Sequence, residues 1–126
     1  MYSIRDVSAA LDGHLVTLPN APQIAWPNVP FTAPAETYLR VNNLPANGEV
    51  YTFNYAQDVP GAYQVTVVAE SSQGAGEAEN LADAVMSHFR VTKIGDVTIE
   101  SINVAPAVVT EDTFEIPVSI NWRVID

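Results

Sequence analysis

The residues of this chain that could do chemistry are few. The two histidines, His14 and His88, lie far apart and neither belongs to a Glu-x-x-His pattern, so the sequence predicts no metal site. Cysteine is absent, which excludes a thiol nucleophile, a thiolate metal site and a disulfide framework. No serine stands in the glycine-flanked turn that presents a hydrolase nucleophile. The usual residue sets for nucleophilic or metal-assisted catalysis are therefore missing.

Two further candidates are better explained by local structure. Glu111, Asp112 and Glu115 form the densest carboxylate group, but the first two are typical of a solvated turn between strands. The sequence Gly74-Ala-Gly76 precedes a helix whose amides could hold an anion. Glutamates follow in the first helical turn and would repel a phosphate, and no lysine accompanies them. We predict a protein that is not an enzyme and takes no cofactor.

Composition bounds the class of protein. The 126 residues carry 15 Asp and Glu against 5 Lys and Arg, a formal net charge of −10, and 48% are hydrophobic. A chain of this length buries about two thirds of its unfolded surface, so residues 1–126 can form a single domain without disulfides. The five cations are scattered, which argues against nucleic-acid binding. Neither a signal peptide nor a membrane-spanning run is visible, so we expect a soluble protein of the cytoplasm.

Apolar spacing predicts two helices. In residues 3–18 and again in residues 77–90, apolar side chains recur three and four positions apart. Between them, residues 19–34 hold five of the nine prolines (19, 22, 27, 30 and 34), which favours an extended arm. Trp26 and Phe31 give this arm apolar anchors, and we expect it to pack on its own domain or on a neighbouring subunit.

Five segments have the pattern of strands: residues 38–44, 50–55, 62–70, 93–105 and 113–124. Turns are predicted at Asn47-Gly48 and at residues 58–61. The last strand alternates at every position, and the strand before it changes phase near Glu100 or Ser101, which indicates a bulge. The order of elements predicts an α+β fold, a mainly antiparallel sheet of about five strands with two helices packed on one face.

Two features of these strands suggest contact with another chain. Tyr51, Phe53 and Tyr55 project from one face of their strand, either into the core or toward a partner. Pro117 cannot donate to a strand ladder, so it should lie on an edge strand or at a bulge, where an edge would be left for another chain.

Several stretches, taken in order, resemble one known family. They are residues 24–34, 37–41, 61–65, 78–85 and 116–120. The most specific is Trp-x-Asn-x-Pro-Phe-x-x-Pro, from Trp26 to Pro34. Together they are similar to the tail terminator (tail completion) proteins of long-tailed bacteriophages. The resemblance implies an α+β virion protein that is assembled in the host cytoplasm. It also implies a homo-hexameric ring that stops tail-tube polymerisation and presents a surface for head attachment.

The resemblance also implies partners and an interface. The partners would be further copies of the chain, the tail tube protein and a head completion or neck protein, without a membrane. DNA would pass through the ring unheld, which suits subunits at a net charge of −10 each. The arm of residues 19–34 and the edge around Pro117 could close such a ring. We expect interface residues among Trp26, Phe31, Arg40, Tyr55, Pro117 and Arg123. The two arginines are included because arginine suits interface ion pairs.

Two alternatives stay open from the sequence. The chain could be another phage ring component, such as a neck completion protein or the tube protein itself. It could also be a small-ligand-binding domain or an enzyme that uses a cleft between the sheet and the helices.

Overall fold

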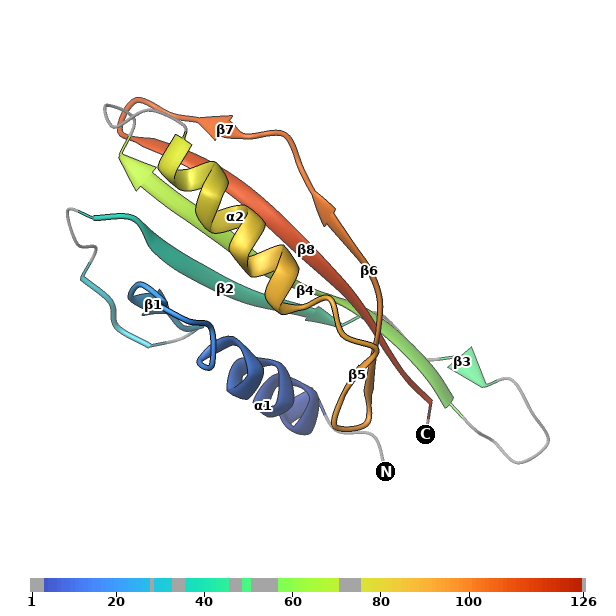
Figure 1. Cartoon of the computed structure of the whole chain (residues 1–126). Helices are drawn as coiled ribbons and strands as arrows, with labels where there is room; N and C mark the ends of the chain where they lie inside the picture. Colours follow the sequence, from blue (N-terminus) through green and yellow to red (C-terminus); the bar gives the residue numbers. More distant parts are fainter. Residues whose placement is uncertain are drawn as a thin grey trace.

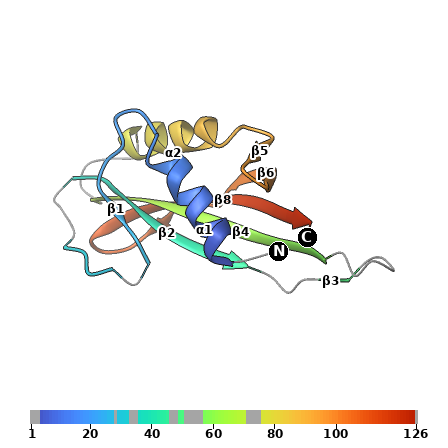
Figure 2. The same cartoon turned by 90° about the horizontal axis from the view of Figure 1, so that it is seen from below.

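A computed structural model shows two helices packed on one face of a single curled sheet (Figures 1 and 2). It describes residues 4–27, 29–32, 36–45, 49–50, 57–70 and 76–125. The helices are α1 (Ile4–Leu15) and α2 (Gly76–His88). The strands are β1 (Ile24–Ala25), β2 (Tyr38–Pro45), β3 (Glu49–Val50), β4 (Gln57–Glu70), β5 (Lys93–Ile94), β6 (Val97–Val104), β7 (Val108–Val109) and β8 (Thr113–Ile125). The turn predicted at Asn47-Gly48 and the aromatic positions 51, 53 and 55 lie outside the described residues.

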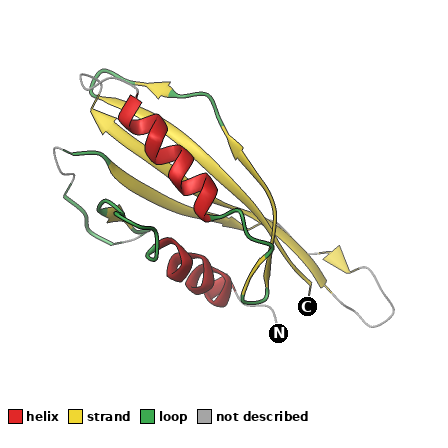
Figure 3. Cartoon of the chain, in the orientation of Figure 1, coloured by secondary structure: helices red, strands yellow, loops and turns green. Residues whose placement is uncertain are grey.

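The sheet is larger and more mixed than the sequence predicts (Figure 3). Its eight strands run in the order β1-β2-β4-β8-β6-β5, with β3 added to β4 and β7 added to β8. Every pair is antiparallel except β1 with β2, which is parallel. The α+β class is confirmed, but a count of about five strands is wrong. The two strands that the sequence pattern missed, β1 and β7, are each two residues long, too short to show a period.

The longest ladder joins β4 to β8, from Asp58 opposite Ile125 to Glu70 opposite Thr113. The turn predicted at residues 58–61 is therefore wrong, because these residues continue β4. Gly61 is needed here for space and not for a turn: a Cβ at this position would lie 2.6 Å from Cε2 of Trp122. The buried indole of Trp122 lies across Gly61, and its Nε1 donates to Oδ1 of Asn43 on β2 at 3.1 Å.

Pro117 does not lie on an edge strand, because β8 runs between β4 and β6. The backbone N of Ala105 donates to the carbonyl of Pro117 at 3.0 Å. In an antiparallel strand, the backbone N–H and C=O of one residue point toward the same neighbouring strand. The side of Pro117 that lacks an N–H therefore faces residues 105–107. Those residues form the break between β6 and β7. The ladder on that side is interrupted where the proline has nothing to donate.

The strand predicted at residues 93–105 is divided by a turn. Gly95 has a φ of 59°, a conformation that glycine adopts without strain, and it separates β5 from β6. Within β6 the pairing with β8 shifts between Ile99 and Ser101. The predicted bulge is thus confirmed, while the single long strand is not.

The helices bury the apolar stripes that define them, as predicted. The buried residues of α1 and the turn after it are Val7, Leu11, Leu15 and Leu18, and those of α2 and its end are Ala78, Ala82, Val85 and Phe89. They share one core with the inward-facing side chains of β2, β4 and β8. Figure 1 shows α2 running along β8.

Two polar contacts fix α1 against its neighbours. His14 and His88 stack with ring centroids 4.2 Å apart. The Nε2 of each ring lies against the backbone carbonyl of the other residue, at 2.6 and 2.7 Å, so the pair ties together the ends of the two helices. In the core, the hydroxyl of Tyr63 donates to the carboxylate of Asp12. Burial raises the pKa of Asp12, and this hydrogen bond partly offsets the rise.

Replacing Gly61 by Ala should destabilise the fold, because the new Cβ and the Trp122 ring cannot occupy the same space. We expect a loss of about 2 kcal/mol in the free energy of unfolding, measured by urea denaturation. Gly13→Ala in α1 is the matched control. A Cβ there meets nothing within 4 Å, so this change should stabilise the helix by about 0.5–1 kcal/mol. Equal effects of the two substitutions would contradict the role given to Gly61.

Candidate functional site

The face of the sheet opposite the helices is the surface that the fold leaves for a partner. Alternation along the strands sends one set of side chains to the core and the other set to this face. No helix of the described chain covers it (Figure 2). We call it the bare face, and its side chains in the central strands are mostly polar or small. They include Arg40, Asn42, Ala62, Gln64, Thr66, Glu115, Pro117, Ser119, Asn121 and Arg123.

An ion pair crosses the bare face from β2 to β8. Nη2 of Arg40 lies 2.7 Å from Oε1 of Glu115. Thr66 and Val68 of the intervening β4 are only 3% and 2% exposed, although they face away from the core. The Arg40 guanidinium lowers the pKa of the Glu115 carboxyl, against the effect of partial burial. The pair thus covers the middle strand where no helix does.

A second ion pair lies on the same face between β8 and β6. Nε of Arg123 lies 2.5 Å from Oε1 of Glu100, next to the bulge in β6. Each of the two arginines expected at an interface therefore has a carboxylate partner within its own subunit. Their contact with a neighbour stays a prediction.

Three of the six predicted interface residues, Arg40, Pro117 and Arg123, come together on the bare face. Phe31 packs against Tyr38, with ring centroids 5.0 Å apart. Trp26 lies instead on the helix side, half-buried against the core. Tyr55 lies outside the described residues.

The arm of residues 19–34 packs on its own subunit where it is described. Ile24 and Ala25 pair with β2, and the backbone N of Leu39 donates to the carbonyl of Gln23 at 3.0 Å. The sequence left open whether this arm contacts its own domain or a neighbour. Own-domain packing is confirmed, and contact with a neighbour is not tested.

Sequence reasoning missed the partners of the two arginines. The alternation of β8 already places Glu115 and Arg123 on one face, but the neighbours of that strand decide which cation each acid meets. Neither Arg40 nor Glu100 can be paired with its partner from spacing along the chain.

The described residues offer no chemical centre of the usual kinds. No group of three or more His, Cys, Asp and Glu residues among them could hold a metal ion. The Nε2 atoms of the stacked histidines already face backbone carbonyls. Neither described helix has the length and apolar character to cross a bilayer.

Comparison with known proteins agrees with a structural role. The profile of a family described as "Phage tail terminator protein" matches residues 6–122. Twelve chains of known structure match the fold. One of them aligns over 100% of this chain and 97% of its own length, with a TM-score of 0.76 and 23% sequence identity. That identity supports likeness of fold alone. No curated protein matches the chain.

The Arg40–Glu115 pair should contribute stability that depends on pH. Because the pKa of Glu115 is lowered in the folded state, its contribution is present above its ordinary pKa of 4.5 and is lost as the pH falls through the lowered value. Glu115→Gln should cost about 0.5–1 kcal/mol at pH 7, and wild type and variant should converge in acid. Urea denaturation at several pH values measures this difference. Glu70→Gln, at an exposed position on the same face, is the control and should change the free energy of unfolding little at pH 7.

Proposed function

Because this chain belongs to the phage tail terminator family, we propose that it caps the head-proximal end of the tail tube as a hexameric ring. In this role it stops tube polymerisation and provides the surface to which the head joins. The observation that carries the proposal is the family match over residues 6–122, which contains α2, β2, β4 and β6 entirely and most of α1 and β8. A structural role in the phage tail follows from the family itself.

The bare face supports the further proposal that DNA passes through the ring without being held. A protein gains affinity for DNA by placing Lys and Arg against phosphates. On this face Arg40 and Arg123 each lie within 2.7 Å of a carboxylate, so a phosphate would have to compete with an existing ion pair. We place this face toward the channel for that reason.

The remaining partners of the ring follow from its position. One ring surface would contact the tail tube protein and the other a head completion or neck protein. The protein would act by shape and contact, without enzymatic activity and without a cofactor.

Native mass spectrometry of the purified protein tests the ring. We expect a discrete hexamer, because unlike surfaces that meet around a closed axis stop at a fixed number of copies. Long filaments would indicate the tube protein instead. A monomer at every concentration, alone and with tube protein, would contradict the proposal, and a monomer with a bound metabolite would favour a ligand-binding domain.

Electron microscopy of particles made without this protein tests its position. Loss of a terminator should give tails of uncontrolled length that do not join heads. Tails of normal length with heads attached would contradict the proposed role as a tail terminator. Re-supplying the wild-type chain is the control, and it should restore both length and joining.

A further inference from the structure

Charged residues are distributed unevenly along this acidic chain. There is none between Asp12 and Glu36, none from residue 59 to 69, and none between Glu100 and Glu111. Residues 59–69 form the middle of β4, which is the central, mostly buried part of the sheet. The other two stretches include exposed segments, residues 19–27 and 29–32 in the first and residues 101–110 in the second, and their lack of charge needs a different explanation.

Segments of these two stretches lie on opposite sides of the sheet. The first contains β1, which ends the sheet beyond β2. The second contains the end of β6 and all of β7, on the far side of β8. We call the described residues 19–27 and 29–32 the arm edge, and residues 101–110 the β6–β7 edge.

Exposed apolar side chains gather in the same stretches. Seven large hydrophobic residues of the described chain are exposed, and five of them lie in the two uncharged stretches. They are Val16, Val29, Val104, Val108 and Val109. Val29, which follows β1 in the arm, is 55% exposed, and Val109 on β7 is 68% exposed. Such patches mark contact surfaces in otherwise polar proteins.

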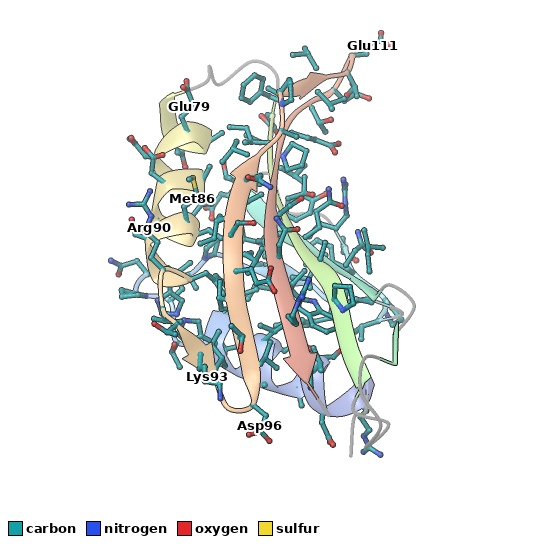
Figure 4. The ribbon with its side chains drawn as sticks, turned by 90° about the vertical axis from the view of Figure 1, so that its right-hand side faces the viewer. Glu79, Met86, Arg90, Lys93, Asp96 and Glu111 are labelled. Carbon is teal, nitrogen blue, oxygen red and sulfur yellow. The ribbon has the colours of Figure 1, made fainter. Side chains whose placement is uncertain are left out.

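The β6–β7 edge also offers backbone groups and space. Among the described residues, β5 pairs only with the start of β6, and no strand pairs with the outer edge of β6 from Glu100 to Val104. Two hollows of about 450 and 340 Å³ lie between α2 and this part of the sheet. Apolar side chains such as Met86, Ile102, Val104 and Phe114 line them, together with the charged residues Glu79, Asp83, Arg90 and Glu100. Figure 4 shows α2 standing beside β6 along this side of the molecule.

We propose that the arm edge of one subunit docks on the β6–β7 edge of the next copy of the chain, along the groove beside α2. This inference rests on the proposed ring and names the two surfaces that close it. The charge balance favours this occupant. Copies at −10 each repel one another, and an arm without charge adds no like-charge repulsion beside the acidic residues Glu79, Asp83 and Glu100 that line the groove. An extended, uncharged arm fits an open strand edge by strand addition.

The position of the two surfaces also fits a ring. They are unlike in sequence and lie at opposite edges of one sheet, so each subunit can use one to bind the copy before it and the other to bind the copy after it. Repeating such a contact closes a ring when the rotation between copies divides a full turn. If each copy instead bound its neighbour through the same surface on both, assembly would stop at a dimer.

Single charges placed on either edge test the pairing. Val29→Asp and Val109→Asp should each prevent ring formation, because a carboxylate would have to be buried in an apolar contact with a like-charged neighbour. We expect association to weaken by roughly tenfold or more, measured by native mass spectrometry and sedimentation at fixed ionic strength. Ala84→Asp adds the same charge on the exposed side of α2 and should leave the ring intact. Circular dichroism should show all three variants folded, since each position is exposed.

Mixing the two edge variants tests the direction of the contact. Val109→Asp keeps an intact arm edge and Val29→Asp keeps an intact β6–β7 edge, so the mixture should form dimers with one copy of each and no ring. A chain carrying both Val29→Lys and Val109→Glu should regain the ring, because opposite charges then meet at every contact.

The outcomes separate this inference from the proposed ring. If the wild-type chain forms a ring and the Val29→Asp and Val109→Asp variants form it equally well, the edge pairing is wrong, while the proposed ring is still supported. A wild-type chain that stays monomeric, alone and with tube protein, would overturn the ring itself.

Discussion

Thirteen consecutive residue pairs join β4 to β8, from Asp58 opposite Ile125 to Glu70 opposite Thr113, and this ladder decides where the other elements can go. Because the side-chain period of a strand is two, one register sets the core face and the bare face of both strands at once. The helices cover the apolar face, and Tyr63, Val65 and Val118 have no exposed surface there. On the other face the same ladder places Glu115 where Arg40 can reach it across β4.

The helices cover one face of the sheet, so the second face and the two edges must be protected in other ways. On the bare face, ion pairs such as Arg40–Glu115 and Arg123–Glu100 shield the strands and occupy the cations. The arm edge and the β6–β7 edge carry exposed valines and no charge, a pattern that a protein acting alone would normally avoid. The division between a polar face and apolar edges is what a subunit of a ring would need.

Sequence reasoning succeeded where one periodic pattern decided the structure. The alternation of β8, the apolar stripe of α2 and the phase change near Ser101 are local signals, and the structure contains all three. It failed at residues 58–61 because glycine is read as a turn, whereas Gly61 serves the close approach of Trp122 from another strand. It expected Pro117 on an edge strand or at a bulge, because the break at residues 105–107 that accommodates the proline is not visible from the pattern of β8. The partner of Arg40 lies 75 positions away and depends on strand order.

Gly61 and Pro117 together also protect the chain from folding incorrectly. If β8 slipped by one residue along β4, Trp122 would lie opposite Pro60 or Ala62, and side-chain carbon would fill the space that Gly61 leaves open. The same slip would carry Pro117 away from the break at residues 105–107. A one-residue slip also turns the apolar side chains of a strand to its other face, and exposed apolar strands favour aggregation. Two residues that look like interruptions of a strand therefore make the slipped alternatives poor competitors of the native state.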